Sequence, residues 1–218
     1  MLAAPSWIPT DELPTTAKGQ RTRQRILKAA EVLFNNQGYN SVGVNEIVEK
    51  AGVSIGTFYR YFEHREHLFV VLLGEVLWSM YRASRGVWQE SESFERNFKA
   101  TSLAYLTAYW ENRKLLNAAD EIVASSDAVR RMWWGLRRDL YGHMAHRVAE
   151  DQARSSLKAL DTQLLTRALG AMTDEYARRA FSAEEYGRAS RSDVERASDV
   201  LGEIWFRSIF GSGTAPTK

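Results

Sequence analysis

The sequence predicts an all-α protein with a small N-terminal domain and a larger C-terminal one. Proline is confined to the terminal tails, because Pro14 and Pro216 bracket a long stretch that contains none. Proline breaks helices from the inside, so its absence favours helix throughout that stretch. Apolar residues recur there with the 3.6-residue period of amphipathic helices, and no run alternates apolar and polar residues as a strand would. We therefore expect about nine helices and no sheet.

The first expected helix runs over residues 21–36. Its apolar residues are spaced to form one stripe, which would face the core of the small domain. Gly38 follows, and glycine adopts at little cost the left-handed conformation that ends helices. The stripe consists of Ile26, Leu27, Ala30, Leu33 and Phe34.

A helix-turn-helix is expected next. A short helix over residues 44–50 ends near Gly52, and a tight turn follows. Ser54 can cap the next helix by accepting a hydrogen bond from a backbone N–H of its first turn. Phe58 and Phe62 give that third helix an apolar side. Two short helices joined by a glycine-bearing turn form the unit that many DNA-binding proteins place in the major groove.

Six longer helices are expected behind this unit. Gly187 and its polar neighbours mark a loop over residues 182–191. We expect the chain to consist of disordered tails at residues 1–17 and 212–218, a small domain at 18–66 and a large domain at 67–211. The longer helices are expected over residues 65–85, 94–110, 113–125, 128–154, 161–181 and 192–210.

Composition narrows the possible chemistry. The chain has no cysteine, which excludes disulfides, thiolate metal sites and thiol nucleophiles. Its net charge is +2, but residues 18–65 hold eight bases against four acids, a local charge of +4 (8 − 4). This front segment is suited to a polyanion, although a basic helical surface can also be merely solvated. We recognise no secretory signal and no apolar stretch that could span a membrane, so a cytoplasmic protein is expected.

The sequence shows neither a catalytic constellation nor a metal site. Serine-elbow, phosphate-loop and dinucleotide-binding patterns are missing. His64 with His67 and His143 with His146 have a spacing that could hold a metal. Zinc needs further ligands, and neither pair has an obvious one nearby. We expect exposed or capping histidines, and no enzyme, metal or cofactor.

Residues 38–69 carry several short motifs at fixed spacing. These are Ala51-Gly52-Val53-Ser54, Gly56-Thr57-Phe58-Tyr59, Tyr61-Phe62 and the Arg65-Glu66 to Leu68-Phe69 opening of the next helix. The pattern resembles the signature of the TetR family of transcriptional regulators. This resemblance implies that the domain at 18–66 binds DNA and that the domain at 67–211 binds a ligand and dimerises.

The third helix should present the side chains that meet DNA. Gly56 would let the backbone come close, Tyr59 could donate to a phosphate, and Arg60 could reach a guanine or a phosphate. The alternative for each is an ordinary exposed residue of an amphipathic helix. The expected DNA-binding residues are Arg21, Asn45, Ser54, Ile55, Gly56, Thr57, Tyr59, Arg60, Tyr61 and Arg65.

Phosphate contacts are also expected outside the third helix. Family members commonly carry Ser or Thr at the start of the second helix, where residues 42–44 are Val-Gly-Val. Contact there would have to come from backbone N–H groups or from Asn45. Arg65 matches a family position usually held by a phosphate-contacting lysine. A basic arm at the start of the first helix could reach a groove or the DNA backbone, or could be a solvated tail. It consists of Lys18, Arg21, Arg23 and Arg25.

The large domain is rich in aromatic residues, which either core packing or a ligand cavity would explain. The family resemblance implies a cavity for a small hydrophobic effector. The Glu203-Ile204-Trp205 segment further resembles an actinobacterial branch of the family, the repressors that control ethionamide activation. Arg137 and Arg138 replace apolar residues of that branch, and they could change the shape of the pocket or admit an acidic group. The cavity residues implied by this resemblance, each of which could equally be plain core, are Leu106, Trp110, Trp133, Leu140, Thr173 and Trp205.

The resemblance also implies a homodimer formed by the last two helices, with recognition helices about 34 Å apart or a multiple of it. We expect a ligand-responsive repressor that binds a palindromic operator in double-stranded DNA and is released by the effector. The helix over residues 65–85 would couple the two sites by changing its tilt. One alternative is a ligand-dependent activator. Another is a carrier or enzyme that keeps the helix-turn-helix as a scaffold.

Overall fold

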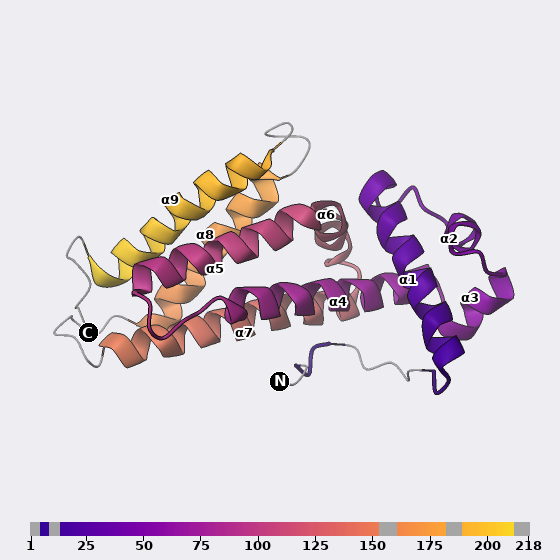
Figure 1. Cartoon of the computed structure of the whole chain (residues 1–218), viewed down its shortest axis with the longest axis horizontal. Helices are drawn as coiled ribbons and strands as arrows, with labels where there is room; N and C mark the ends of the chain where they lie inside the picture. Colours follow the sequence, from indigo (N-terminus) through magenta and orange to yellow (C-terminus); the bar gives the residue numbers. More distant parts are fainter. Residues whose placement is uncertain (1–4, 9–13, 153–160, 182–188, 212–218) are drawn as a thin grey trace. The chain divides into compact units, whose positions relative to one another are not determined.

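The structure is a computed structural model that describes residues 5–8, 14–152, 161–181 and 189–211, and these hold nine α-helices and no strand (Figure 1). The all-α prediction is confirmed. No helix in these ranges is long and apolar enough to cross a membrane. The helices are α1 (Ala17–Gln37), α2 (Val44–Ala51), α3 (Ile55–Tyr61), α4 (Arg65–Gly86), α5 (Phe94–Glu111), α6 (Arg113–Ile122), α7 (Asp127–Gln152), α8 (Thr162–Ala180) and α9 (Arg191–Phe210).

Helix boundaries lie within a few residues of those expected, and the largest difference is at the N-terminus. α1 begins at Ala17 because the Thr16 hydroxyl accepts a hydrogen bond from the Gly19 N–H at 3.1 Å and caps the helix. Trp7 is only 7% exposed. The expectation of a disordered tail over residues 1–17 is therefore corrected for the described residues 5–8 and 14–17. Residues 1–4 and 9–13, the tail at 212–218 and loop residues 182–188 lie outside the description.

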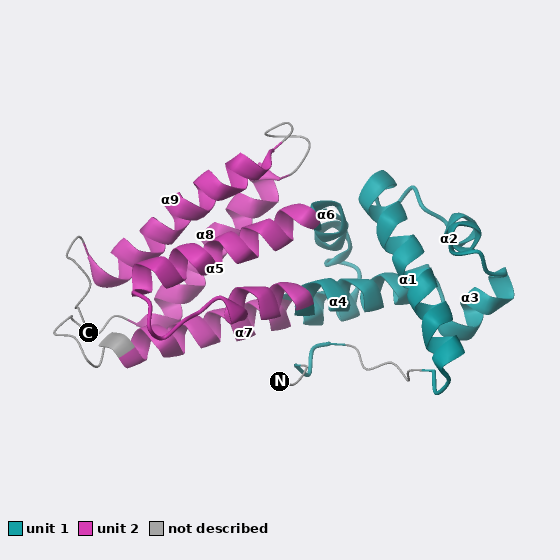
Figure 2. Cartoon of the chain, viewed as in Figure 1, with its two compact units in different colours: residues 1–78, 112–133 teal, residues 79–111, 134–218 magenta. Residues whose placement is uncertain are grey.

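The chain divides into two compact units, and the division falls within α4 (Figure 2). Unit 1 comprises residues 1–78 and 112–133, and unit 2 comprises residues 79–111 and 134–218. The sequence placed the boundary after residue 66, whereas unit 1 also contains most of α4, all of α6 and the start of α7. Side-chain contacts to α6 explain the difference. Lys114 donates to the Asn36 carbonyl at 2.9 Å, and the Asn40 amide donates to Glu121 at 3.1 Å.

Aromatic rings build the core of unit 1. The Phe69 ring lies 5.9 Å from Phe34 and 4.6 Å from Tyr39, measured between centroids. Phe58 and Phe62 are 0% and 1% exposed, and their rings lie 5.7 Å apart. These two side chains anchor α3 from beneath, as the sequence predicted, and leave its opposite face at the surface.

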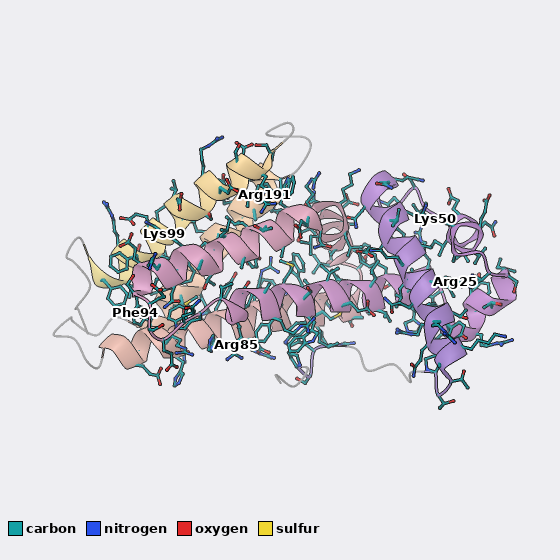
Figure 3. All side chains as sticks on the ribbon, in the orientation of Figure 1. Arg25, Lys50, Arg85, Phe94, Lys99 and Arg191 are labelled. Atoms are coloured by element: carbon teal, nitrogen blue, oxygen red, sulfur yellow. The ribbon has the colours of Figure 1, made fainter. Side chains whose placement is uncertain are left out.

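Unit 2 is organised around the close packing of α5 against α9. Gly202 on α9 faces Lys99 on α5, and a Cβ at position 202 would lie 2.8 Å from the Lys99 Cα. Figure 3 labels Lys99 beside the ribbon of α9. The Phe98 ring stacks on Trp205 with centroids 5.8 Å apart. The buried cluster at this contact consists of Phe98, Val148, Leu169, Trp205, Phe206, Ile209 and Phe210.

Candidate functional site

The outer face of α3 is exposed along its whole length. Ile55 is 48% exposed and Tyr59 is 55% exposed, while Gly56 and Arg60 are exposed as well. A Cβ added to Gly56 would meet nothing within 4 Å, so the helix surface there is open. Thr57 and Tyr61 are half-buried at the sides of the helix. The exposed groups on this face are therefore the Tyr59 hydroxyl, the Arg60 guanidinium and the backbone at Gly56.

Ser54 caps α3 as the sequence predicted. Its hydroxyl accepts a hydrogen bond from the Thr57 N–H at 3.2 Å, and the Ser54 and Thr57 hydroxyls lie 2.9 Å apart. The hydrogen bond between the two side chains thus fixes both at the first turn of the helix. A hydroxyl has one donor and two acceptor positions, so each can still take part in at least one further hydrogen bond.

Glu46 replaces the missing hydroxyl at the start of α2. Its carboxylate accepts a hydrogen bond from the Gly43 N–H at 2.5 Å, which satisfies one free donor of the helix N-terminus. A carboxylate at this end also repels a phosphate. Backbone N–H contact with phosphate at α2, one of the two routes expected from the sequence, is therefore obstructed at Gly43. Asn45 is exposed and keeps the other route open.

Two arginines of the expected basic arm have structural partners. Arg25 donates to the Ala51 carbonyl at 2.5 Å and to the Gly52 carbonyl at 2.8 Å, which caps the C-terminus of α2. Arg23 is 8% exposed and lies 3.9 Å from a carboxylate oxygen of Glu75. Arg21 is exposed on the same helix. The arm that could reach a polyanion is therefore shorter than the sequence suggested.

Arg65 also has a structural role. It donates to the Val42 carbonyl at 2.8 Å and to the Tyr39 carbonyl at 3.3 Å, and its guanidinium lies 4.2 Å from the centre of the Tyr39 ring. These contacts tie the start of α4 to the segment between α1 and α2. A substitution here would disturb that segment as well as any phosphate contact, so Tyr59 and Arg60 are better probes of the α3 face.

A cavity of about 70 Å³ lies within unit 2, lined by residues of α4, α5, α7, α8 and α9 and of the segment after α4. One buried water molecule needs about 10–15 Å³ on this scale, so the cavity has room for a small group. Its wall is mostly apolar. The apolar side chains in the wall are Trp88, Phe98, Leu140, Met144 and Trp205.

A buried acid forms one side of this cavity. Asp174 accepts a hydrogen bond from the Arg137 Nε at 2.6 Å and others from the Tyr105 and Tyr141 hydroxyls. Burial, and secondly the Asp174 charge, raise the pKa of both tyrosines, so both hydroxyls stay protonated and donate. The cluster joins α5, α7 and α8 with its charges matched. Gly170 makes room for it, because a Cβ there would clash with the Tyr141 ring.

The histidines of the two pairs singled out in the sequence lie in different surroundings. Burial, followed by the charges of Arg85 and Arg147, lowers the pKa of His143 to about 4, so this cavity residue is neutral at pH 7. His64 accepts a hydrogen bond from the His67 N–H at 3.0 Å, which caps the start of α4. Within the described ranges, no three His, Asp or Glu side chains are grouped so that they could hold a metal ion.

Comparison with known proteins identifies the family. Residues 26–72 match the family model described as bacterial regulatory proteins, tetR family. Residues 98–211, more than half of the chain, match the model described as transcriptional regulator EthR, C-terminal domain. The chain belongs to the TetR family of transcriptional regulators. Its relatives and structural neighbours are regulators and not enzymes.

Relatives match this TetR-family chain over most of its length or over a shorter stretch. The HTH-type transcriptional regulator EthR of Mycolicibacterium smegmatis is 24% identical over 208 residues, which is 90% of this chain and 91% of that protein. The HTH-type transcriptional repressor KstR of Rhodococcus jostii is 41% identical over 63 residues, 29% of each chain.

Solved structures show the same fold. A transcriptional regulator from Rhodococcus sp. Rha1 has a TM-score of 0.70 at 17% identity, covering 85% of this chain and 96% of its own. Salmonella enterica GusR has a TM-score of 0.67 at 19% identity, covering 91% and 99%. A helix-turn-helix unit followed by a helical C-terminal domain, as predicted, is therefore the fold of this regulator.

Three of the six side chains expected at the TetR regulator's ligand site line the cavity, namely Leu140, Thr173 and Trp205. The Trp205 indole donates to the Thr173 hydroxyl at 3.0 Å, which fixes both side chains. The other three expected residues are not in this wall. Leu106 and Trp133 are buried, with Trp133 in unit 1, and the Trp110 indole donates to the Ala189 carbonyl at 3.3 Å.

Several cavity residues were not anticipated from the sequence. Ser84 and Arg85 come from α4, Thr101 and Tyr105 from α5, and His143 from α7. The sequence held one signal for Arg85. It follows Tyr81 by one helical turn, so a charged residue lies on the same face of α4 as an aromatic one. The expected role of Arg137 and Arg138 is corrected. Arg137 is paired with Asp174, and the exposed Arg138 lies 3.1 Å from Asp139.

Proposed function

We propose that this TetR-family regulator is a repressor that binds a palindromic operator as a homodimer and is released by a small hydrophobic effector. The observation that carries the proposal is the exposed outer face of α3, held from beneath by Phe58 and Phe62. A helix of this kind at the second position of a helix-turn-helix enters the major groove. Because the target is chromosomal DNA, the regulator would act in the cytoplasm.

The side chains on α3 suit different parts of the operator. The Arg60 guanidinium can donate two parallel hydrogen bonds to a guanine or neutralise a phosphate. The Tyr59 hydroxyl can donate to a phosphate, and the exposed Ile55 can contact a thymine methyl group. Arg60 would thus supply specificity if it contacts a base and affinity if it contacts a phosphate. Tyr59 would orient the helix on the DNA backbone.

Affinity for DNA measured with α3 variants tests this proposal. A duplex is first selected by the wild-type protein from a random pool. Tyr59→Ala and Arg60→Ala are each expected to weaken binding to this duplex by about 1–3 kcal/mol, or roughly 5- to 150-fold. The matched control is Arg96→Ala, an exposed arginine on α5 that lies outside both α3 and the proposed dimer surface and should leave affinity unchanged. Equal affinities for wild type, Tyr59→Ala and Arg60→Ala would contradict the assignment of α3.

Apolar side chains left uncovered on α8 and α9 support a homodimer. Leu164 and Val200 are each 59% exposed, and Ile204 is 37% exposed. Ala168 and Ala171 are exposed on the same helix as Leu164. Exposed apolar surface of this kind is unfavourable in water, and small side chains within it allow helices of two subunits to approach closely.

Charge introduced into this surface should separate the dimer. Leu164→Glu and Val200→Glu each place like charges on both subunits of a two-fold interface and remove buried apolar area. We expect the mass measured by light scattering to fall from dimer to monomer at micromolar concentration. Gln163→Glu, an exposed neighbour, should remain dimeric. A dimeric Val200→Glu variant would place the interface elsewhere.

α4 provides a route by which an effector could act. Arg65 at its first residue is tied to Tyr39 and Val42 near the helix-turn-helix, while Ser84 and Arg85 at its other end line the cavity. An effector that favours one tilt of α4 would shift the population between operator-binding and released forms. The coupling must be reciprocal, so operator should weaken effector binding by the same factor. A ligand-dependent activator would use the same residues with the opposite sign of coupling.

A further inference from the structure

Two classes of polar group are distinct in the cavity wall. In the first class, every group has a partner within the protein. The Tyr105 and Tyr141 hydroxyls donate to Asp174, and Arg137 neutralises that carboxylate. Thr173 accepts from the Trp205 indole and donates to the Leu169 carbonyl at 3.0 Å. These groups shape the wall and have little remaining capacity for a ligand.

The second class consists of hydroxyls without a partner. The Ser84 and Thr101 side-chain oxygens are buried, and neither has a hydrogen-bond partner in the described part of the protein. Ser84 as a whole is only 3% exposed. A buried hydroxyl without a partner loses its hydrogen bonds to water without replacement, which is unfavourable. Both residues line the cavity, so a ligand that offers an acceptor there would recover that cost.

Arg85 adds an unmatched positive charge to the same wall. Its guanidinium donates to the Tyr81 hydroxyl at 3.0 Å, and none of the described carboxylates pairs with it. The other arginines near the cavity differ in this respect. Arg137 is paired with Asp174, and Arg147 lies 3.2 Å from a carboxylate oxygen of Glu90. Figure 3 labels Arg85 on α4, next to Ser84 in the sequence.

An apolar cavity with one unmatched guanidinium and two hydroxyl donors is complementary to an anion on an apolar body. We propose that the effector of this regulator is a small apolar monocarboxylate whose carboxylate is bound by Arg85, Ser84 and Thr101. Guanidinium–carboxylate hydrogen bonds are among the strongest in proteins, and a carboxylate can accept from several donors at once. The inference rests on the proposed function only in calling this ligand the effector.

The rest of the wall suits the apolar body. Trp88 and Phe98 pack edge to face with ring centroids 5.7 Å apart, and Trp205 stacks on Phe98 with centroids 5.8 Å apart. His143 is neutral at pH 7, so it neither repels an apolar group nor adds a second charge. The volume of about 70 Å³ favours a short chain or a single ring. Long-chain acids would require side chains to move.

Calorimetric titration of the full-length protein without DNA tests this proposal. The probes are hexanoate and phenylacetate, each compared with its primary amide, which has the same shape and no charge. We expect each acid to bind at least about tenfold more tightly than its amide, corresponding to about 1.4 kcal/mol. Arg85→Gln should abolish this preference, and Arg85→Lys should retain part of it. Ser84→Ala and Thr101→Val should each weaken acid binding severalfold.

Controls separate this inference from misfolding and from the proposed function. Arg82→Gln removes an exposed arginine from the same helix and should leave the preference for acids intact. Thermal unfolding shows whether each variant is folded. Equal binding of acids and amides, an undiminished preference in Arg85→Gln, or no binding of either acid would overturn the proposal. Selection of an operator by the unliganded wild type tests the proposed function separately, so the two can fail independently.

Discussion

Replacing Asp174 with alanine is expected to lower the free energy of unfolding by about 3–5 kcal/mol, the usual cost of removing one partner of a buried ion pair. The Asp174 and Arg137 side chains are only 10% and 18% exposed. Without the carboxylate, the guanidinium and the Tyr105 and Tyr141 hydroxyls lose their shared acceptor. Three helices, α5, α7 and α8, would then be joined by unsatisfied polar groups, which is worse than an apolar contact.

Urea-induced unfolding of matched variants measures this effect. Asp174→Asn keeps one acceptor oxygen and the shape of the side chain, so it should cost less than Asp174→Ala. Glu175→Gln is the control, because Glu175 is half exposed and pairs with Arg178 and Arg179 at the surface. Pairs of that kind are worth about 0–1 kcal/mol. Similar losses for Asp174→Ala and Glu175→Gln would show that the buried cluster does not stabilise unit 2.

Gly202→Ala is expected to destabilise the protein by about 1–3 kcal/mol, although alanine is the better helix former. The new Cβ would lie 2.8 Å from the Lys99 Cα and 3.1 Å from its backbone N. Backbone atoms cannot move aside as the end of a side chain can. α9 would have to move away from α5. This movement would separate Phe98 from Trp205 and enlarge the cavity that both residues line.

Gly142→Ala is the matched control for this substitution. Gly142 lies inside α7 and is exposed, and a Cβ there would meet nothing within 4 Å. Alanine at this position should stabilise the protein by about 0.5–1 kcal/mol through helix propensity alone. Chemical denaturation of the two variants should therefore show changes of opposite sign in the free energy of unfolding. A stabilised Gly202→Ala variant would mean that α5 and α9 are not as close as described.

Local patterns predicted most of the fold. The proline-free stretch and the 3.6-residue apolar period reflect interactions within each helix, so the helices were placed within a few residues. The start of α1 was missed because Thr16 lies outside the periodic stretch that defined the helix. Trp7 was assigned to a disordered tail because no periodic pattern surrounds it, yet it is buried.

The candidate sites were predictable to different degrees. The exposed face of α3 depends on one short motif, and Ile55, Tyr59 and Arg60 are exposed as expected. The cavity is assembled from five helices, so no single segment encodes it. Resemblance identified Trp205 and Thr173, but the roles of Arg65 and Arg85 depend on which partners the fold supplies.

Binding of the purified regulator to its own upstream DNA, compared with a scrambled duplex across a salt series, tests the central claim most directly. We expect saturable binding that prefers the upstream sequence and weakens steeply as salt rises, because Lys and Arg side chains release counterions from the phosphates. Two protected half-sites separated by about one DNA turn, or a multiple of it, would match a dimer. The absence of preference for upstream DNA, and for any duplex selected from a random pool, would contradict the account.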